Sequence, residues 1–281
     1  MNKNNYKILV LSDLKDTSKN TLKSAISLAK MVGGSIDLFH VKKPTDVVVR
    51  ENQLSAMRSI NEEHYLIRNK IKDYILPFSE AYEIPISYNF AIGNVKNEIE
   101  KYVQETQPDV VVLGKRKPKR ITFGGESTAS FILNNYPGIV LMVSEKHAIE
   151  PNQKMILGML NNSVDSLKST FTENLMAHTH TPIKLFKIVK NPDIAQSTPN
   201  TVSVNGAVEY VFEHGDNVVK NISKYVAINK INLLWVSREN KDSFINSTIN
   251  GSMDELNISL LLDNKKINNH KKNKTYYEST Y

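Results

Sequence analysis

Cysteine is absent from this chain of 281 residues. Disulfide bonds, thiolate metal sites and a cysteine nucleophile are therefore excluded, and the composition is compatible with a reducing cytoplasm. Long apolar runs are missing too. Near the start only Ile8 to Leu11 are continuously apolar, which matches neither a signal peptide nor a membrane span. We expect a cytoplasmic protein without a membrane partner.

Sequence patterns of common catalytic sites are also absent. The chain has no Gly-x-Ser-x-Gly elbow for a nucleophilic serine. His178 and His180 could begin a metal site, but no third ligand is suitably spaced, so a surface pair at a helix end is favoured. We expect no metal site and no catalytic residue.

The net charge of +7 is unevenly distributed, because residues 264–281 carry five lysines and a single glutamate. This segment is poor in apolar residues, so we expect a basic, disordered tail that begins after the last strand. Such a tail is compatible with nucleic acid or acidic lipid, but a solvated chain end is the more common outcome. We do not expect a nucleic-acid partner.

Apolar runs alternate with helical periodicities along the first half of the chain. The runs expected to form strands lie at 7–11, 35–41, 86–92, 110–113 and 139–143. Four amphipathic or capped segments between them are expected to form helices, including a long one that carries Ile67, Ile71 and Ile75 on one face. Most of the strands are continuously apolar, which is typical of a parallel sheet covered by helices on both faces.

The same plan recurs in the second half. The helix that contains Tyr102 matches the one that contains Tyr225 at a constant offset of 123 positions, and the following strand keeps this offset. Further apolar runs match the first three strands and lie at 155–160, 183–189 and 208–212. The sequence therefore predicts an α/β protein with two repeated Rossmann-like domains, 1–147 and 152–263, each a five-stranded parallel sheet flanked by helices.

The most informative stretch follows the fourth strand. The apolar run ends at Gly114, and a basic loop, 115–120, leads to a glycine pair and to a helix that starts near Ser127 and Thr128. Free backbone N–H groups and the helix dipole favour an anion at such a place. The arrangement is typical of phosphate-binding sites in α/β proteins.

Several segments together resemble the universal stress protein family, namely ILVLSD at 8–13, GNVKNEIEKYV at 93–103 and DVVVLG at 109–114. The resemblance implies a sheet in the order 3-2-1-4-5, pairing through fifth strands and, in one branch of the family, ATP binding between strands one and four. It places Asp13 at the ribose or adenine edge and Val41 beside the base. The implied site for ATP or AMP, with Mg²⁺, comprises Ser12, Asp13, Val41, Gly114, Arg116, Gly125, Ser127 and Thr128.

The sequence departs from the ATP-binding pattern of the family at two positions. Lys117 stands where the second glycine belongs, and Glu126 occupies the position of a hydroxyl residue. A side chain blocks close approach of backbone to phosphate, and a carboxylate competes with an anion at a helix N-terminus. The neighbouring basic residues, among them Arg116, could supply direct cation contacts instead. In the alternative reading, Asp13 caps a turn and Val41 belongs to the core.

Two functional hypotheses follow. In the first, the chain is a stress-response protein that senses an adenine nucleotide in its N-terminal domain, with at most slow ATP hydrolysis. In the second, it is a protein-interaction module without a nucleotide, acting as an internal pseudo-dimer. The second domain lacks a glycine after its fourth strand and is expected to bind no phosphate. Its fifth strand, 258–262, is expected to meet 139–143 about a pseudo-twofold axis, because unpaired apolar edges require covering. Protein partners and a homodimer are compatible with both hypotheses.

Overall fold

The structure is a computed structural model. It describes residues 6–44, 53–115, 127–160, 169–189, 203–204, 207–215, 217–237 and 258–263, with the backbone alone described over 53–60 and 203–204. The expected tail, 264–281, lies outside the described residues.

The first half forms a parallel sheet at the positions that the apolar runs predict. Its strands are β1 (Tyr6–Leu11), β2 (Gly34–Lys42), β3 (Ile86–Ile92), β4 (Val110–Gly114) and β5 (Ile139–Val143). They lie in the order β3-β2-β1-β4-β5, and all four neighbouring pairs are parallel. This strand order is the expected one.

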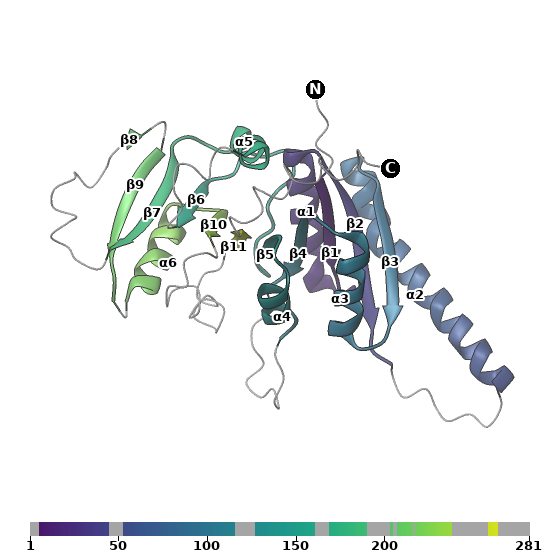
Figure 1. Ribbon diagram of the computed structural model, residues 1–281. Helices are drawn as coiled ribbons and strands as arrows, with labels where there is room; N and C mark the ends of the chain where they lie inside the picture. Colours follow the sequence, from purple (N-terminus) through teal and green to yellow (C-terminus); the bar gives the residue numbers. More distant parts are fainter. Residues whose placement is uncertain are drawn as a thin grey trace, which may run out of the picture.

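Helices cover both faces of this sheet (Figure 1). The helical elements are η1 (Asp16–Ser18), α1 (Lys19–Val32), α2 (Gln53–Tyr82), α3 (Val95–Thr106) and α4 (Thr128–Asn135). Alternate residues of each strand point to opposite faces, so Ile8 and Val10 pack with α1 and α2, whereas Leu9 packs with α3 and α4. Among the described helices, none combines the length and hydrophobicity needed to cross a membrane.

The second half is built from shorter elements. They are β6 (Leu157–Leu160), α5 (Thr170–Ala177), β7 (Ile183–Val189), β8 (Ser203–Val204), β9 (Ala207–Glu213), α6 (Val218–Ile228), β10 (Leu233–Ser237) and β11 (Ser259–Asp263). The strands follow the order β11-β10-β6-β7-β9-β8, with β8 antiparallel to β9. α5 ends with its C-cap at His178, which agrees with the expected helix end at His178 and His180, whereas β8 was not predicted, because two residues are too few for a clear periodicity.

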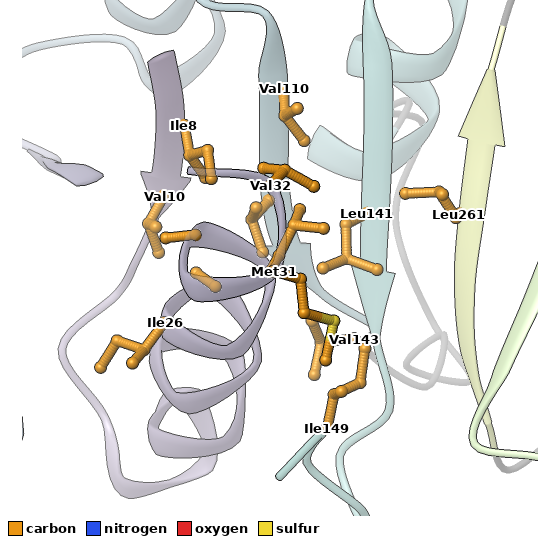
Figure 2. Packing of buried hydrophobic residues seen from close by; sticks show 14 of the residues in the cluster. Ile8, Val10, Ile26, Met31, Val32, Val110, Leu141, Val143, Ile149 and Leu261 are labelled. Carbon is orange, nitrogen blue, oxygen red and sulfur yellow. The ribbon is translucent and has the colours of Figure 1, made fainter. Parts of the chain in front are cut away.

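In the described part of the chain, the two halves share one continuous sheet of eleven strands, rather than two separate five-stranded sheets. β5 and β11 pair in antiparallel fashion, with Leu141 opposite Leu261. Both leucines are fully buried, and Figure 2 shows them side by side at the junction. The physical reason is the one that predicted their meeting: each strand would otherwise present an apolar, unpaired edge. Their pairing is therefore confirmed, and it joins the sheets.

The segment between β5 and β6 is fastened to α1 by side chains along one face of that helix. Ser24 Oγ accepts a hydrogen bond from the backbone N–H of Ile149 at 2.9 Å, and Lys23 Nζ lies 2.6 Å from Glu150 Oε2. Asn20, Ser27 and Lys30 make further bonds to the same segment. Figure 2 shows Ile149 packed beside Met31 and Val143. The connection is thus part of the core and holds the second half against α1.

Replacing Leu141 by alanine should destabilise the chain by about 2–5 kcal/mol, because it deletes buried methyl groups at the junction of the sheet. The matched control is Leu66→Ala on α2, where the leucine is 55% exposed and the expected change is below about 0.5 kcal/mol. Urea unfolding midpoints of the two variants measure the difference. Equal midpoints would show that the junction contributes little to the core.

Candidate functional site

The carboxyl ends of β1 and β4 lie side by side at the point where the strand order reverses. Leu11 is opposite Leu113, so the residues that follow them, Ser12 and Gly114, lie at the same edge of the sheet, where Gly114 still pairs with Val143 of β5. β2 lies on one side of β1 and β4 lies on the other, so the strand order reverses at β1. The crevice at the carboxyl ends of the strands at such a point is the usual place for a ligand in an open α/β sheet. The topology therefore brings Ser12, Asp13 and Gly114 to one edge.

Val41 and the start of α4 belong to the same edge. The Val41 side chain lies on the face covered by α3 and α4, where it packs in one cluster with Leu11 and with Ile132 of α4. Ser127 and Thr128 begin α4, after the loop that leaves β4. Two predicted site residues, Arg116 and Gly125, lie outside the described residues, as do Lys117 and Glu126.

The Asp13 carboxylate supports the turn that joins β1 to α1. Its Oδ1 accepts hydrogen bonds from Ser18 Oγ and from the backbone N–H of Lys15, the latter at 3.3 Å. Its Oδ2 lies 3.6 Å from Lys15 Nζ, and the side chain is 23% exposed. The turn-forming role weighed in the sequence analysis is therefore present, and one edge of the carboxylate still reaches the surface.

The residue after Asp13 has an unusual backbone. Leu14 has a φ of 57°, in the left-handed region that bulky side chains rarely adopt, although its side chain is buried. Ser12 Oγ accepts a hydrogen bond from the Leu14 N–H at 3.1 Å, which stabilises this conformation. Strained backbone of this kind is often found at binding sites. Four other described non-glycine residues also have a positive φ, so this conformation alone does not mark a binding site.

Two residues brace this turn from the α2 side. His40 Nδ1 lies 2.9 Å from the Ser12 carbonyl oxygen, so Nδ1 is the protonated donor. Burial lowers the pKa of the His40 imidazole, which favours the neutral form. The Tyr74 hydroxyl of α2 lies near Ser12, whose side chain acts to lower the pKa of Tyr74, but burial prevails and raises this pKa to about 12.

His40 is a partly buried side chain that supports the turn through its hydrogen bond to the Ser12 carbonyl. Tyr74 was missed. It lies between Ile71 and Ile75 on the apolar stripe of α2, where a tyrosine resembles any other core residue. A polar hydroxyl on an apolar stripe was the only available signal.

The packing of α1 explains why a glycine occupies position 114. A Cβ atom at this position would lie 2.8 Å from Oγ1 of Thr21, which is buried in α1. The family resemblance places Gly114 in the implied nucleotide site. In the structure the close approach is made by α1, so Gly114 alone is no evidence for a ligand.

Ser127 acts as the N-cap of α4. Its Oγ accepts a hydrogen bond from the Ser130 N–H at 3.0 Å and lies 2.9 Å from Ser130 Oγ. Thr128 is the first residue of the helix. The predicted hydroxyl-bearing helix start is therefore correct, and the positive end of the α4 dipole faces the carboxyl edge of the sheet.

Comparison with known proteins shows which family this sequence matches and which solved structures share its fold. The sequence pattern that defines the universal stress protein family matches residues 4–144. A universal stress protein from Archaeoglobus fulgidus DSM 4304 superposes with a TM-score of 0.61 at 15% identity, covering 92% of this chain and 96% of that one. A putative universal stress protein from Pseudomonas aeruginosa UCBPP-PA14 gives 0.54 at 14%, covering 93% and 94%. No curated protein matches the chain in sequence.

Gly114→Ala should destabilise the chain by about 1–3 kcal/mol, because the new methyl group overpacks against Thr21. Gly215→Ala is the matched control, since a Cβ there would meet nothing within 4 Å. It should change stability by less than about 1 kcal/mol. Chemical denaturation of both variants gives the comparison, and a harmless Gly114→Ala would mean that α1 is less tightly placed than its contacts indicate.

Burial of His40 should make the chain less stable in mild acid. Because its folded-state pKa is lowered, the unfolded chain binds more protons below the usual histidine pKa of about 6.5, and stability falls as pH decreases from there to the folded-state pKa. His40→Asn keeps a donor near the Ser12 carbonyl but does not titrate. Thermal midpoints at pH 7.5 and 5.0 should therefore differ more for the original chain than for this variant. An equal difference in both would refute the assignment.

Proposed function

Because this chain belongs to the universal stress protein family, we propose that it is a cytoplasmic tandem member of that family whose N-terminal half binds ATP or AMP with Mg²⁺. The observation that carries the proposal is the register of β1 against β4, which puts the Asp13 carboxylate at the switch point of the sheet. Carboxylates accept hydrogen bonds from ribose hydroxyls and from the amino group of adenine.

Each described residue of the site has a role in this proposal. Asp13 Oδ2 accepts from the ribose or the adenine edge, and Ser12 positions the turn that carries it. Val41 provides an apolar wall for the base. Ser127 and Thr128 bring the positive end of the α4 dipole to the phosphates. From sequence, Arg116 and Gly125 belong to the same loop and supply a cation and close backbone approach.

The tandem part of the proposal is supported by the register at the junction. Leu141 lies opposite Val112 within the first half, and Leu261 lies opposite Trp235 within the second. Val112 and Trp235 are related by the sequence offset of 123, so Leu141 and Leu261 are counterparts. At the junction these two counterparts pair with each other. A twofold axis between equivalent strands requires this self-pairing.

A second correspondence supports the duplication. Tyr102 donates a hydrogen bond to Asp37 Oδ2 at 2.5 Å, whereas Tyr225, its counterpart at the same offset, lies with its ring centroid 5.8 Å from Lys184 Nζ. Asp37 and Lys184 each lie two positions before a phenylalanine that packs on the tyrosine ring. We infer domains at 1–147 and 152–263 that form an internal pseudo-dimer, with the basic tail after them.

A different function, a protein-interaction platform without a nucleotide, is favoured by a specific set of observations. Asp13 and Gly114, the best-placed described residues of the site, both have structural explanations in the turn and in the packing of α1. Lys117 and Glu126 also depart from the ATP-binding pattern in sequence. In this case the function would be to bind protein partners on the surface formed by the two halves.

Titration calorimetry with ATP, AMP and adenosine distinguishes the two functions. Asp13→Asn keeps an acceptor for the turn but replaces Oδ2 by an amide donor, so it should weaken nucleotide binding about tenfold, as expected for a lost hydrogen bond to a charged group. The matched control is Asp16→Asn, because the Asp16 side chain is 91% exposed and pairs with Lys19. This control should bind like the original chain.

The phosphate loop provides a complementary variant. Lys117→Gly combined with Glu126→Ser should raise the affinity for Mg-ATP, and removal of the carboxylate should contribute about 1 kcal/mol that shrinks at high salt. If neither the original nor this repaired chain binds any of the three ligands, the interaction platform replaces the nucleotide sensor.

A further inference from the structure

β3 forms one end of the eleven-stranded sheet, and no other strand of the described chain pairs with its outer side. The opposite end of the sheet is different, because it is formed by β8, which has only two residues. Figure 1 shows β3 at the outer end of the first half, with α2 beside it. Within the described residues, β3 therefore has a row of open backbone groups along seven residues.

The pairing of β3 with β2 identifies the backbone groups that point outward. The Gly93 N–H donates to the Lys42 carbonyl at 3.0 Å, so the odd-numbered residues of this segment bond toward β2. Because the bonding direction alternates along a strand, the even-numbered residues point their N–H and C=O groups away from β2. These outward residues are Ile86, Tyr88, Phe90 and Ile92. In agreement with this, the Phe90 N–H donates to the side-chain Oδ1 of Asn89 at 2.8 Å.

β3 lacks the features that usually protect an exposed edge. Its seven residues are ISYNFAI, with no charged side chain and no proline. Charges, prolines and very short strands are the usual means of preventing two edges from pairing. α2 packs on β3 through His64 and Phe90, and its Tyr65, Leu66 and Leu76 side chains are each more than half exposed. This end of the sheet thus combines open backbone groups with apolar surface that is incompletely covered.

We propose that β3 pairs with the β3 strand of a second copy of this chain, antiparallel and about a twofold axis at Asn89. Asn89 is the central residue of the seven, so this register overlaps the two strands completely. Tyr88 then lies opposite Phe90 of the other copy, and their outward N–H and C=O groups bond across the strands. The Phe90 N–H exchanges its bond to Asn89 for a carbonyl of the second copy.

A second copy is the occupant that the edge itself favours. Self-pairing joins strands of equal length, and no like charges meet because β3 has none. The chain already covers two other apolar edges in this way, since β5 and β11 pair in antiparallel fashion. A twofold axis also closes the assembly at two copies, because the far end of the sheet is a different strand. The proposal does not depend on nucleotide binding.

The lack of cysteine makes the register directly testable. In the full chain, Asn89→Cys would place two thiols opposite each other at the axis, in a pair whose Cα atoms are about 4.5 Å apart and within reach of a disulfide. Oxidation should therefore give a covalent dimer of twice 31.8 kDa in non-reducing electrophoresis. Asn97→Cys is the matched control, because Asn97 is also exposed but lies on α3, and it should not be cross-linked.

Charges at the same position test the association itself. Asn89→Lys should raise the dissociation constant of the dimer about tenfold or more, because two like charges meet at the axis, and Asn89→Glu should do the same. An equimolar mixture of these two variants should associate again as a mixed dimer. Sedimentation equilibrium measures each case, with Asn97→Lys as the control that should associate like the original chain. Urea midpoints show whether each variant is folded.

The remaining outcomes overturn the proposal. An original chain that sediments as a monomer at micromolar concentration has no such interface. A dimer that resists both charged variants and is not cross-linked by Asn89→Cys is held by another surface. A mixture that associates no better than its components shows that position 89 does not lie at the axis. If a charged variant does not fold, the cross-linking experiment still decides. The proposed nucleotide site, at β1 and β4, is unaffected by each of these results.

Discussion

The architecture of this protein depends on one antiparallel strand pair, β5 with β11. Without it, each half would leave an apolar strand unpaired at the edge of its sheet, with backbone groups open to any other strand. The pairing removes both edges and continues the sheet from β3 to β8. The segment between β5 and β6 is bound to α1, because the first half ends at this junction and the second half begins beside it. The helices follow from the same constraint, since each face of a continuous sheet has to be covered.

In the candidate site, the residues that are proposed to bind a nucleotide also have structural roles. Asp13 holds a turn and offers a carboxylate edge, Ser127 caps a helix and introduces its dipole, and Gly114 gives room to Thr21 beside the strand end. None of these residues is explained by binding alone. Leu14 adopts its left-handed conformation in the turn that follows β1, and Tyr74 reaches this turn from α2.

Much of the fold was predictable because its strands are short, continuous apolar runs separated by helical periodicities. The strand order of the first half and the meeting of β5 with β11 followed from the family resemblance and from the need to cover apolar edges. The shortest element was not predictable, because the two residues of β8 are too few to show a period. The site was predictable as far as topology places strand ends, which brought Asp13 and Gly114 together. Tyr74 was not, because its contact with Ser12 joins residues far apart in sequence and a tyrosine on an apolar stripe indicates only burial.

Joining the two halves in one polypeptide has a genetic consequence. In a symmetric pair of identical chains, every substitution appears twice, so a change that harms one binding edge harms both. Leu141 pairs with Leu261, and in the proposed tandem arrangement these counterparts are encoded separately, so each half can vary while the other is kept. The exchange of Asp37 for Lys184 at matching positions is a difference of charge sign that identical chains could not maintain. A single chain thereby allows one half to change at its strand ends without any change in the other half.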